Sequence, residues 1–60
     1  MKLGDWLTEN NVHQVDFAKE IGVHPSTLSR FLHGKRVPVL KIIQKIHDAT
    51  GGKVTWKDWN

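Results

Sequence analysis

The chain has 60 residues, a formal net charge of +3 and a sequence pI of about 9.6. This length suits one small domain, residues 1–60, that buries only about 60% of its unfolded surface. The absence of cysteine excludes disulfides and thiolate metal sites, and no apolar run approaches the roughly 20 residues of a membrane helix. No secretory signal is visible, and we interpret MKLGDW as the native N-terminus of an intact small protein.

Four helices are predicted, and the first covers residues 3–9. Leu3, Trp6 and Leu7 recur there at helical spacing, and the two asparagines that follow suit the left-handed geometry of a helix end. We expect Trp6 to pack in the core beside both leucines.

Residues 14–34, with the sequence QVDFAKEIGVHPSTLSRFLHG, predict two short helices joined by a tight turn. The first of them, residues 14–21, has one apolar side made by Phe17, Ala18 and Ile21. Gly22 follows where the chain must turn, because glycine adopts left-handed geometry without a Cβ penalty.

The third helix is predicted from about Pro25 to His33, because proline suits a first turn where its missing N–H is not needed. Gly34 ends it, and a short basic loop follows. The apolar side of this helix consists of Leu28, Phe31 and Leu32.

The fourth helix is expected to open at Pro38 and to stop at two glycines. Its apolar residues recur at helical intervals: Val39, Leu40, Ile42, Ile43, Ile46 and Ala49. The tail, residues 53–60, is either a strand starting at Val54 or a turn that Thr55 caps with Asp58 as its acidic partner. We favour a short turn or an irregular tail, so the fold class is an all-α bundle of four helices, or five with that turn.

Residues 14–34 resemble the helix-turn-helix of the lambda-repressor-like family, which includes the Cro and repressor proteins of bacteriophages and their bacterial relatives. The wider four-helix pattern covers roughly residues 3–51, and the sequence departs from the family at Pro25, where many members carry a glutamine. The resemblance implies that the second helix of the motif enters the major groove of duplex DNA. The residues that carry it are Gln14, Ala18, Gly22, Val23, Leu28 and Phe31.

The polar side of the third helix supplies candidates for reading base edges. Arg30 is the strongest, because a guanidinium can bond guanine O6 and N7 together. Without the motif, these would be ordinary solvated residues of a surface helix. The candidates are His24, Ser26, Thr27, Ser29, Arg30 and His33.

A second group of side chains is predicted to contact phosphates. Gln14 lies at a helix start, where backbone N–H groups and the helix dipole favour an anion. Lys35 and Arg36 fall in the loop that the family's docking pose places along the sugar–phosphate backbone, although a solvated basic turn is the alternative. The full set is Gln14, Lys19, Lys35, Arg36 and Lys41, with Ser29 as a further candidate, and the other lysines are expected to be solvent charges.

Two interpretations of the tail tryptophans stay open: Trp56 and Trp59 cover the bottom of the small core, or they form a dimer contact. The four histidines are widely scattered and lack convergent carboxylates. They match no zinc motif and no catalytic arrangement, so we expect no enzyme activity, metal or cofactor.

The expected function is that of a small DNA-binding transcriptional regulator in the cytoplasm of a bacterial or phage-infected cell, with no small-molecule ligand. A homodimer, at least on DNA, would occupy a roughly palindromic operator and block polymerase or a competing repressor. The main alternative is an antitoxin or antirepressor that binds a protein through the tail tryptophans and the apolar side of the fourth helix. RNA binding is a weaker alternative, because no strand platform with paired aromatics is predicted.

Overall fold

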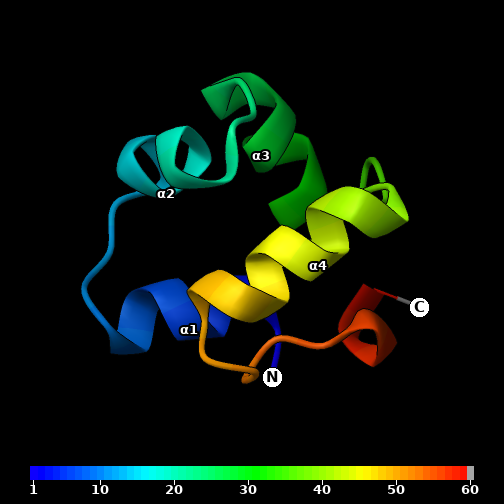
Figure 1. The fold of residues 1–60 in the computed structure, drawn as a ribbon. Helices are drawn as coiled ribbons and strands as arrows, with labels where there is room; N and C mark the ends of the chain where they lie inside the picture. The colour runs from blue at the N-terminus through cyan, green and yellow to red at the C-terminus, as the bar shows by residue number, and fades with distance from the viewer. Residues whose placement is uncertain (60) are drawn as a thin grey trace.

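A computed structural model describes residues 1–59, and all of their regular secondary structure is helical (Figure 1). The predicted all-α fold is therefore confirmed. Asn60, the last residue of the predicted tail, lies outside the described residues. The elements in chain order are α1 (Leu3–Glu9), α2 (Gln14–Ile21), α3 (Pro25–Leu32), α4 (Leu40–Ala49) and the 3-10 helix η1 (Trp56–Trp59).

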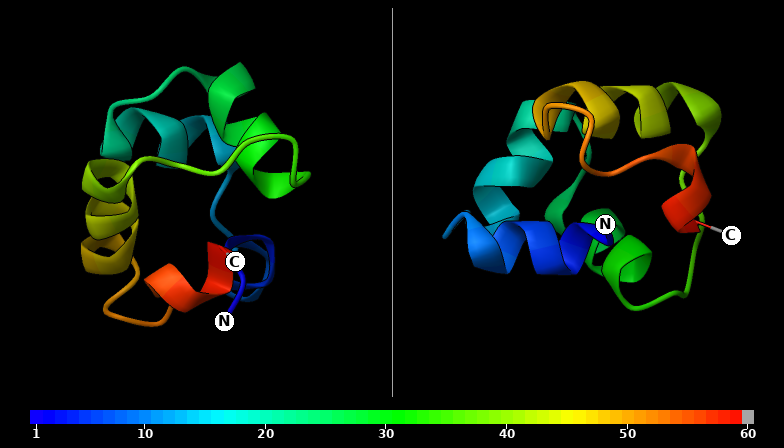
Figure 2. Two further views of the ribbon diagram at one scale, coloured as in Figure 1. Left: turned by 90° about the vertical axis from the view of Figure 1, so that its right-hand side faces the viewer. Right: turned by 90° about the horizontal axis from the view of Figure 1, so that it is seen from below.

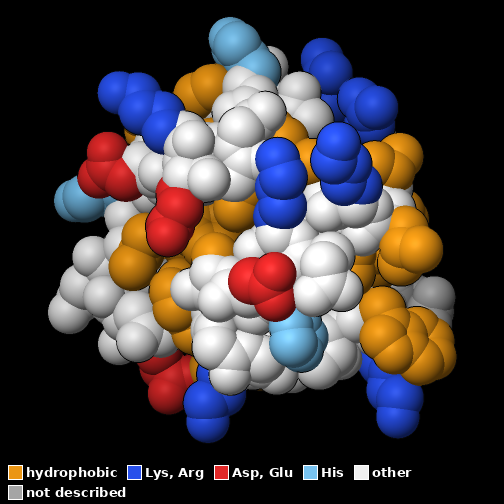
Figure 3. All heavy atoms as spheres, in the orientation of Figure 1, with side chains coloured by type: hydrophobic (Ala, Val, Ile, Leu, Met, Phe, Trp, Pro, Cys, Tyr) orange, Lys and Arg blue, Asp and Glu red, His pale blue; other side chains and the backbone are white. Residues whose placement is uncertain are grey.

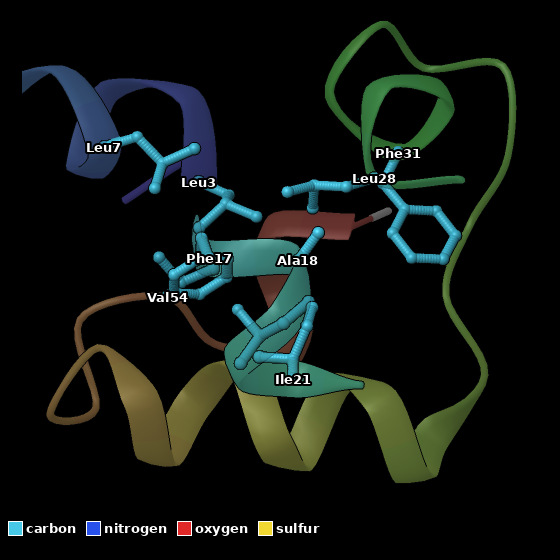
Figure 4. Close-up of a cluster of buried hydrophobic side chains, with 9 residues drawn as sticks. Leu3, Leu7, Phe17, Ala18, Ile21, Leu28, Phe31 and Val54 are labelled. Carbon is cyan, nitrogen blue, oxygen red and sulfur yellow. The ribbon is translucent and has the colours of Figure 1, made fainter. Parts of the chain in front are cut away.

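The helices surround one small core. Figure 2 shows α3 and α4 on different sides of the bundle, with α1 and the C-terminal turn near each other at its base. The side chains of α2 lie at the centre of the core, between those of α1 and α3 (Figure 4). The buried cluster is Leu3, Leu7, Phe17, Ala18, Ile21, Leu28, Phe31, Ile46 and Val54.

Tight packing and a defined turn fix how α3 follows α2. Ala18 is fully buried, so no bulky side chain separates the two helices. Gly22 adopts φ 77° and ψ 31° in the left-handed region, as predicted. The Val23 N–H then donates to the Ala18 carbonyl at 2.9 Å, which satisfies an orphan carbonyl at the end of α2.

Two predicted helix boundaries shift. α3 ends at Leu32, and His33 is its C-cap rather than its last residue. The prediction that Pro38 opens α4 is wrong: Val39 keeps an extended backbone (φ −68°, ψ 160°) and α4 begins at Leu40. Pro38 is instead buried ahead of the helix, whereas the Val39 and Leu40 side chains are 63% and 77% exposed.

The tail forms a short turn, so the strand interpretation is wrong. The predicted pairing of Thr55 with Asp58 is confirmed, but the acceptor is the Asp58 carboxylate rather than the Thr55 hydroxyl. The Asp58 carboxylate accepts hydrogen bonds from the Thr55 N–H at 2.8 Å and the Thr55 hydroxyl at 3.2 Å. Its other oxygen pairs with the Met1 ammonium at 3.0 Å, which ties the two ends of the chain together. Within residues 1–59, no helix combines the length and hydropathy that a bilayer span requires.

Candidate nucleic-acid interface

The outer side of α3 is polar, and its inner side is packed in the core. Leu28 and Phe31 are 0% and 6% exposed, so they fix the rotation of the helix about its axis. Ser26, Arg30 and His33 follow one another at the spacing i, i+4, i+7, which places them in a row on the opposite side. Of the six predicted readers, His24, Ser26, Arg30 and His33 are exposed, and Thr27 and Ser29 are partly buried.

The start of α3 carries a side-chain cap that the sequence did not predict. His24 is the N-cap residue, and its Nδ1 accepts a hydrogen bond from the Ser26 backbone N–H at 3.1 Å. The Ser26 hydroxyl oxygen lies 2.7 Å from the same nitrogen. Histidine is not among the usual N-cap residues, which is why the pattern of the sequence gave no signal for this contact.

The start of α2 offers uncapped backbone donors. His13 is the N-cap residue there and makes no side-chain capping hydrogen bond. Gln14 is the first residue of the helix and is exposed. The predicted phosphate contact at Gln14 therefore has free first-turn N–H groups beside it, where the helix dipole also favours an anion.

The electrostatics of this region favour an anion, because the chain contains no Asp or Glu between Glu20 and Asp48. Lys35 and Arg36 are exposed in the loop after α3. Arg36, His33 and Lys2 also line one cleft of about 460 Å³, so Lys2 adds a cation beside the loop that its position in the sequence did not indicate. Asp58, which is paired with the Met1 ammonium, lines the same cleft.

The remaining predicted phosphate residues lie on other elements. Lys19 is exposed in the last turn of α2, and Lys41 is exposed in the first turn of α4. Figure 3 shows basic side chains over α4 on the face turned to the viewer. Lys45, which was expected to be a solvent charge, brings its Nζ within 3.8 Å of the position that a Cβ on Gly22 would take. Its charge therefore lies at the C-terminal end of α2, where the helix dipole favours a cation.

The two tail tryptophans have different surroundings. Trp59 is partly buried and packs edge-on against Phe31, with ring centroids 6.3 Å apart. Trp56 is 59% exposed, and the Lys57 ammonium lies 5.8 Å from its ring centroid. Figure 3 shows hydrophobic side chains along the edge of the molecule where α4 begins and η1 lies. The exposed hydrophobic residues of these segments are Val37, Val39, Leu40 and Trp56, which we call the apolar edge.

No cluster of three His, Asp or Glu side chains that could hold a metal ion occurs within residues 1–59. His24 Nδ1 is hydrogen-bonded to the Ser26 hydroxyl, and His47 Nδ1 lies 3.4 Å from the carboxylate of Asp48, the next residue in the chain. The exposed side chains of α3 and the loop after it are hydrogen-bond donors, acceptors and cations.

The sequence profile of the helix-turn-helix family matches residues 3–57, which is nearly the whole chain. The match includes α2, the turn at Gly22 and α3, together with the supporting helices. No curated protein and no solved structure matches the chain significantly.

Proposed function

The chain belongs to the lambda-repressor-like helix-turn-helix family of DNA-binding regulatory domains, and we propose that it is a sequence-specific transcriptional regulator that reads duplex DNA with α3. The observation that carries this proposal is the exposed polar side of α3. Its readers stand on a helix that Leu28 and Phe31 anchor in the core, in a part of the chain without acidic residues. Rigid presentation matters because base edges are read by directional hydrogen bonds.

The contacts divide into those that specify and those that position. Arg30 is assigned to a guanine, whose O6 and N7 match the guanidinium fork. The other readers supply hydroxyl and imidazole groups to neighbouring base edges: His24, Ser26, Thr27, Ser29 and His33. Phosphate contacts that fix the register are assigned to Gln14, Lys19, Lys35, Arg36 and Lys41.

Two copies are proposed to bind together, because one domain offers few base contacts. The Cα trace measures 23 × 21 × 18 Å, and side chains extend about 3 Å beyond it. One copy is thus about 29 Å across at most, about 5 Å less than the separation of about 34 Å between half-sites one helical turn apart. Neighbouring copies could therefore meet at most along a narrow surface, for which the apolar edge is the candidate. The predicted contact at Trp56 belongs to this edge, whereas Trp59 would contribute mainly by supporting it.

The proposed mode of action is occupancy of a roughly palindromic operator in the cytoplasm of a bacterial or phage-infected cell, with polymerase or a competing repressor excluded. The experiment that tests the function is selection of bound duplexes from a random pool at about 100 mM salt. We expect a short motif with two inverted half-sites about one helical turn apart. A pool that shows no enrichment, with binding equal for all sequences, would contradict a sequence-specific regulator.

The dimer has its own test, because its residues lie outside the DNA-reading helix. Sedimentation over a range of concentrations should show that Leu40→Ser and Trp56→Ser weaken self-association of the protein, alone or on an operator duplex. Val15→Ser is the matched control, since Val15 is also an exposed hydrophobic residue (50%) but belongs to α2. Equal effects of all three substitutions would argue against the apolar edge as the contact.

The rival function, an antitoxin or antirepressor module, is supported by the same exposed residues, because an apolar edge can also receive a different protein. The two functions predict different behaviour of the isolated chain. A protein-binding module would remain monomeric at all concentrations and would show no salt-sensitive duplex binding.

A further inference from the structure

A cleft of about 460 Å³ opens between the start of α1, the end of α3 with the loop after it, and η1. The view from below in Figure 2 shows these segments next to one another. Small-molecule sites in proteins commonly measure about 300–1,000 Å³. The cleft is thus large enough for a small organic molecule.

Part of the lining is apolar. The rings of Phe31 and Trp59, which pack edge-on with centroids 6.3 Å apart, both line the cleft, and so does Leu32. The Val37 side chain, which is 61% exposed, adds an apolar group from the loop after α3. Because contact with these groups removes apolar surface from water, the lining favours a ligand with an aromatic or aliphatic body over an inorganic anion.

The rest of the lining is cationic. Lys2 and Arg36 are exposed and line the cleft, together with the His33 imidazole. The one acidic residue in the lining, among residues 1–59, is Asp58, whose carboxylate is already paired with the Met1 ammonium at 3.0 Å. The ion pairs within the same residues include neither Lys2 nor Arg36. Both cations are therefore left to bind an anionic group.

Trp59 also has a donor that the described part of the chain does not use. Its indole Nε1 is buried and has no hydrogen-bond partner among residues 1–59. Burial of a donor without an acceptor is unfavourable, so a ligand oxygen that reaches this N–H would remove a penalty as well as form a bond.

We propose that this cleft binds a small organic carboxylate with an aromatic or aliphatic body, and that the ligand weakens DNA binding. The carboxylate would bind Lys2 and Arg36, and the body would lie against Phe31 and Trp59. The sequence had indicated no small-molecule ligand. The effect on DNA rests on the proposed function, because Arg36 is assigned to a phosphate and His33 to a base. A ligand that binds Arg36 and covers His33 would compete with the duplex.

Binding is tested first on the chain without DNA, with phenylbutyrate as the probe and ¹H–¹⁵N spectra as the readout. The three indole N–H signals include their own controls, because Trp59 lines the cleft whereas Trp6 and Trp56 do not. The Trp59 signal should shift saturably with phenylbutyrate. The neutral analogue phenylbutyramide and inorganic phosphate should each bind about 5-fold more weakly or worse, because one lacks the charge and the other the apolar body.

Variants separate the cleft from the rest of the surface. Lys2→Gln and Arg36→Gln should each weaken phenylbutyrate binding about 5-fold. Lys53→Gln is the matched control, because Lys53 is exposed and lies outside the cleft. Gly4→Leu should fill the cleft and block the probe: Gly4 lines it, and nothing lies within 4 Å of an added Cβ. An unshifted Trp59 signal, or equal binding of phenylbutyrate, phenylbutyramide and phosphate, would overturn the inference.

The effect on DNA is tested with the selected operator. Saturating phenylbutyrate should lower operator affinity about 5-fold or more, the lower end of typical coupling between two ligands. Gly4→Leu should bind the operator like the unmodified chain, with an affinity that the probe does not change. Saturable probe binding with unchanged operator affinity would overturn the effect on DNA. Absence of specific duplex binding would instead contradict the proposed function, and saturable probe binding would still support the cleft as a ligand site.

Discussion

The Thr50 hydroxyl accepts a hydrogen bond from the Val54 backbone N–H at 3.1 Å. The same hydroxyl donates to the Ile46 carbonyl at 2.9 Å, one turn back in α4. Thr50 is 4% exposed and Val54 is fully buried, so this buried contact joins the end of α4 to the first core residue of the tail. It holds the turn that leads to η1.

Replacing Thr50 by valine should destabilise the fold by about 1–3 kcal/mol, because the buried Val54 N–H would lose its acceptor. The free energy of unfolding from urea titration measures this change. Thr8→Val is the control: the Thr8 hydroxyl makes a similar bond to the Gly4 carbonyl at 3.0 Å, but it is exposed. That variant should stay within about 0.5 kcal/mol of the unmodified chain. Equal losses of unfolding free energy in both variants would show that the hydrogen bond to the Val54 N–H does not stabilise the fold.

Gly22→Ala should destabilise the fold by about 1–2 kcal/mol through its backbone, because φ is 77° and an L-residue is strained there. Steric clash is not the cause, since the nearest atom to an added Cβ is the Lys45 Nζ at 3.8 Å. Gly4→Ala is the opposite case: nothing lies within 4 Å of the added Cβ in α1, and stability should rise by about 0.5 kcal/mol. The melting temperatures of both variants test these two predictions. A higher melting temperature for Gly22→Ala would contradict backbone strain at this turn.

Acid should weaken the anchoring of the tail through Asp58. The hydrogen bond from the Thr55 N–H, followed by the one from the N-terminal ammonium, lowers the pKa of Asp58 below its ordinary value of 3.8. A carboxyl whose pKa is lower in the folded state stabilises the fold above its unfolded pKa, and this contribution is lost as the pH falls through the folded pKa. Asp58→Asn should therefore melt below the unmodified chain at pH 6, by a margin that shrinks below pH 3.8. Glu9→Gln removes an exposed carboxyl at the end of α1 and is the control for the loss of one negative charge.

Replacing Arg30 and replacing Arg36 by alanine should affect DNA binding in different ways. Arg30→Ala should weaken specific binding by about 1–3 kcal/mol and relax the preference at one base pair. Arg36→Ala should weaken binding to all sequences alike and reduce the slope of log affinity against log salt by about one unit. Titrations of specific and scrambled duplexes at several salt concentrations separate the two effects. An unchanged slope for Arg36→Ala would remove it from the phosphate contacts.

The helices were predictable because each has apolar residues at helical spacing and most have clear stop signals. α2 has the predicted bounds, and Gly22 marks its end. The start of α4 was not predictable from Pro38, because proline suits both a first helical turn and the extended segment that the chain adopts. The exposure of Leu40 also followed from tertiary packing, since periodicity cannot tell which apolar residues remain outside the core.

Within the candidate interface, sequence reasoning indicated the outer side of α3 and the basic loop. It did not indicate the cap at His24, because histidine accepts at Nδ1 only in one tautomer and is an uncommon N-cap residue. Lys45 is exposed, in agreement with its prediction as a solvent charge. The sequence could not show that its ammonium lies near the turn at Gly22, because α2 and α4 are far apart in sequence and meet only in the fold.

The most direct test of the account is amide chemical-shift mapping of the chain with its selected duplex and with a scrambled duplex. The specific duplex should shift residues 24–33 most strongly, together with the loop at Lys35 and Arg36, and should leave the last turns of α4 unaffected. The scrambled duplex should shift mainly the loop and the start of α2, where phosphates bind. If residues 24–33 remain unshifted by the specific duplex, α3 is not the element that reads DNA.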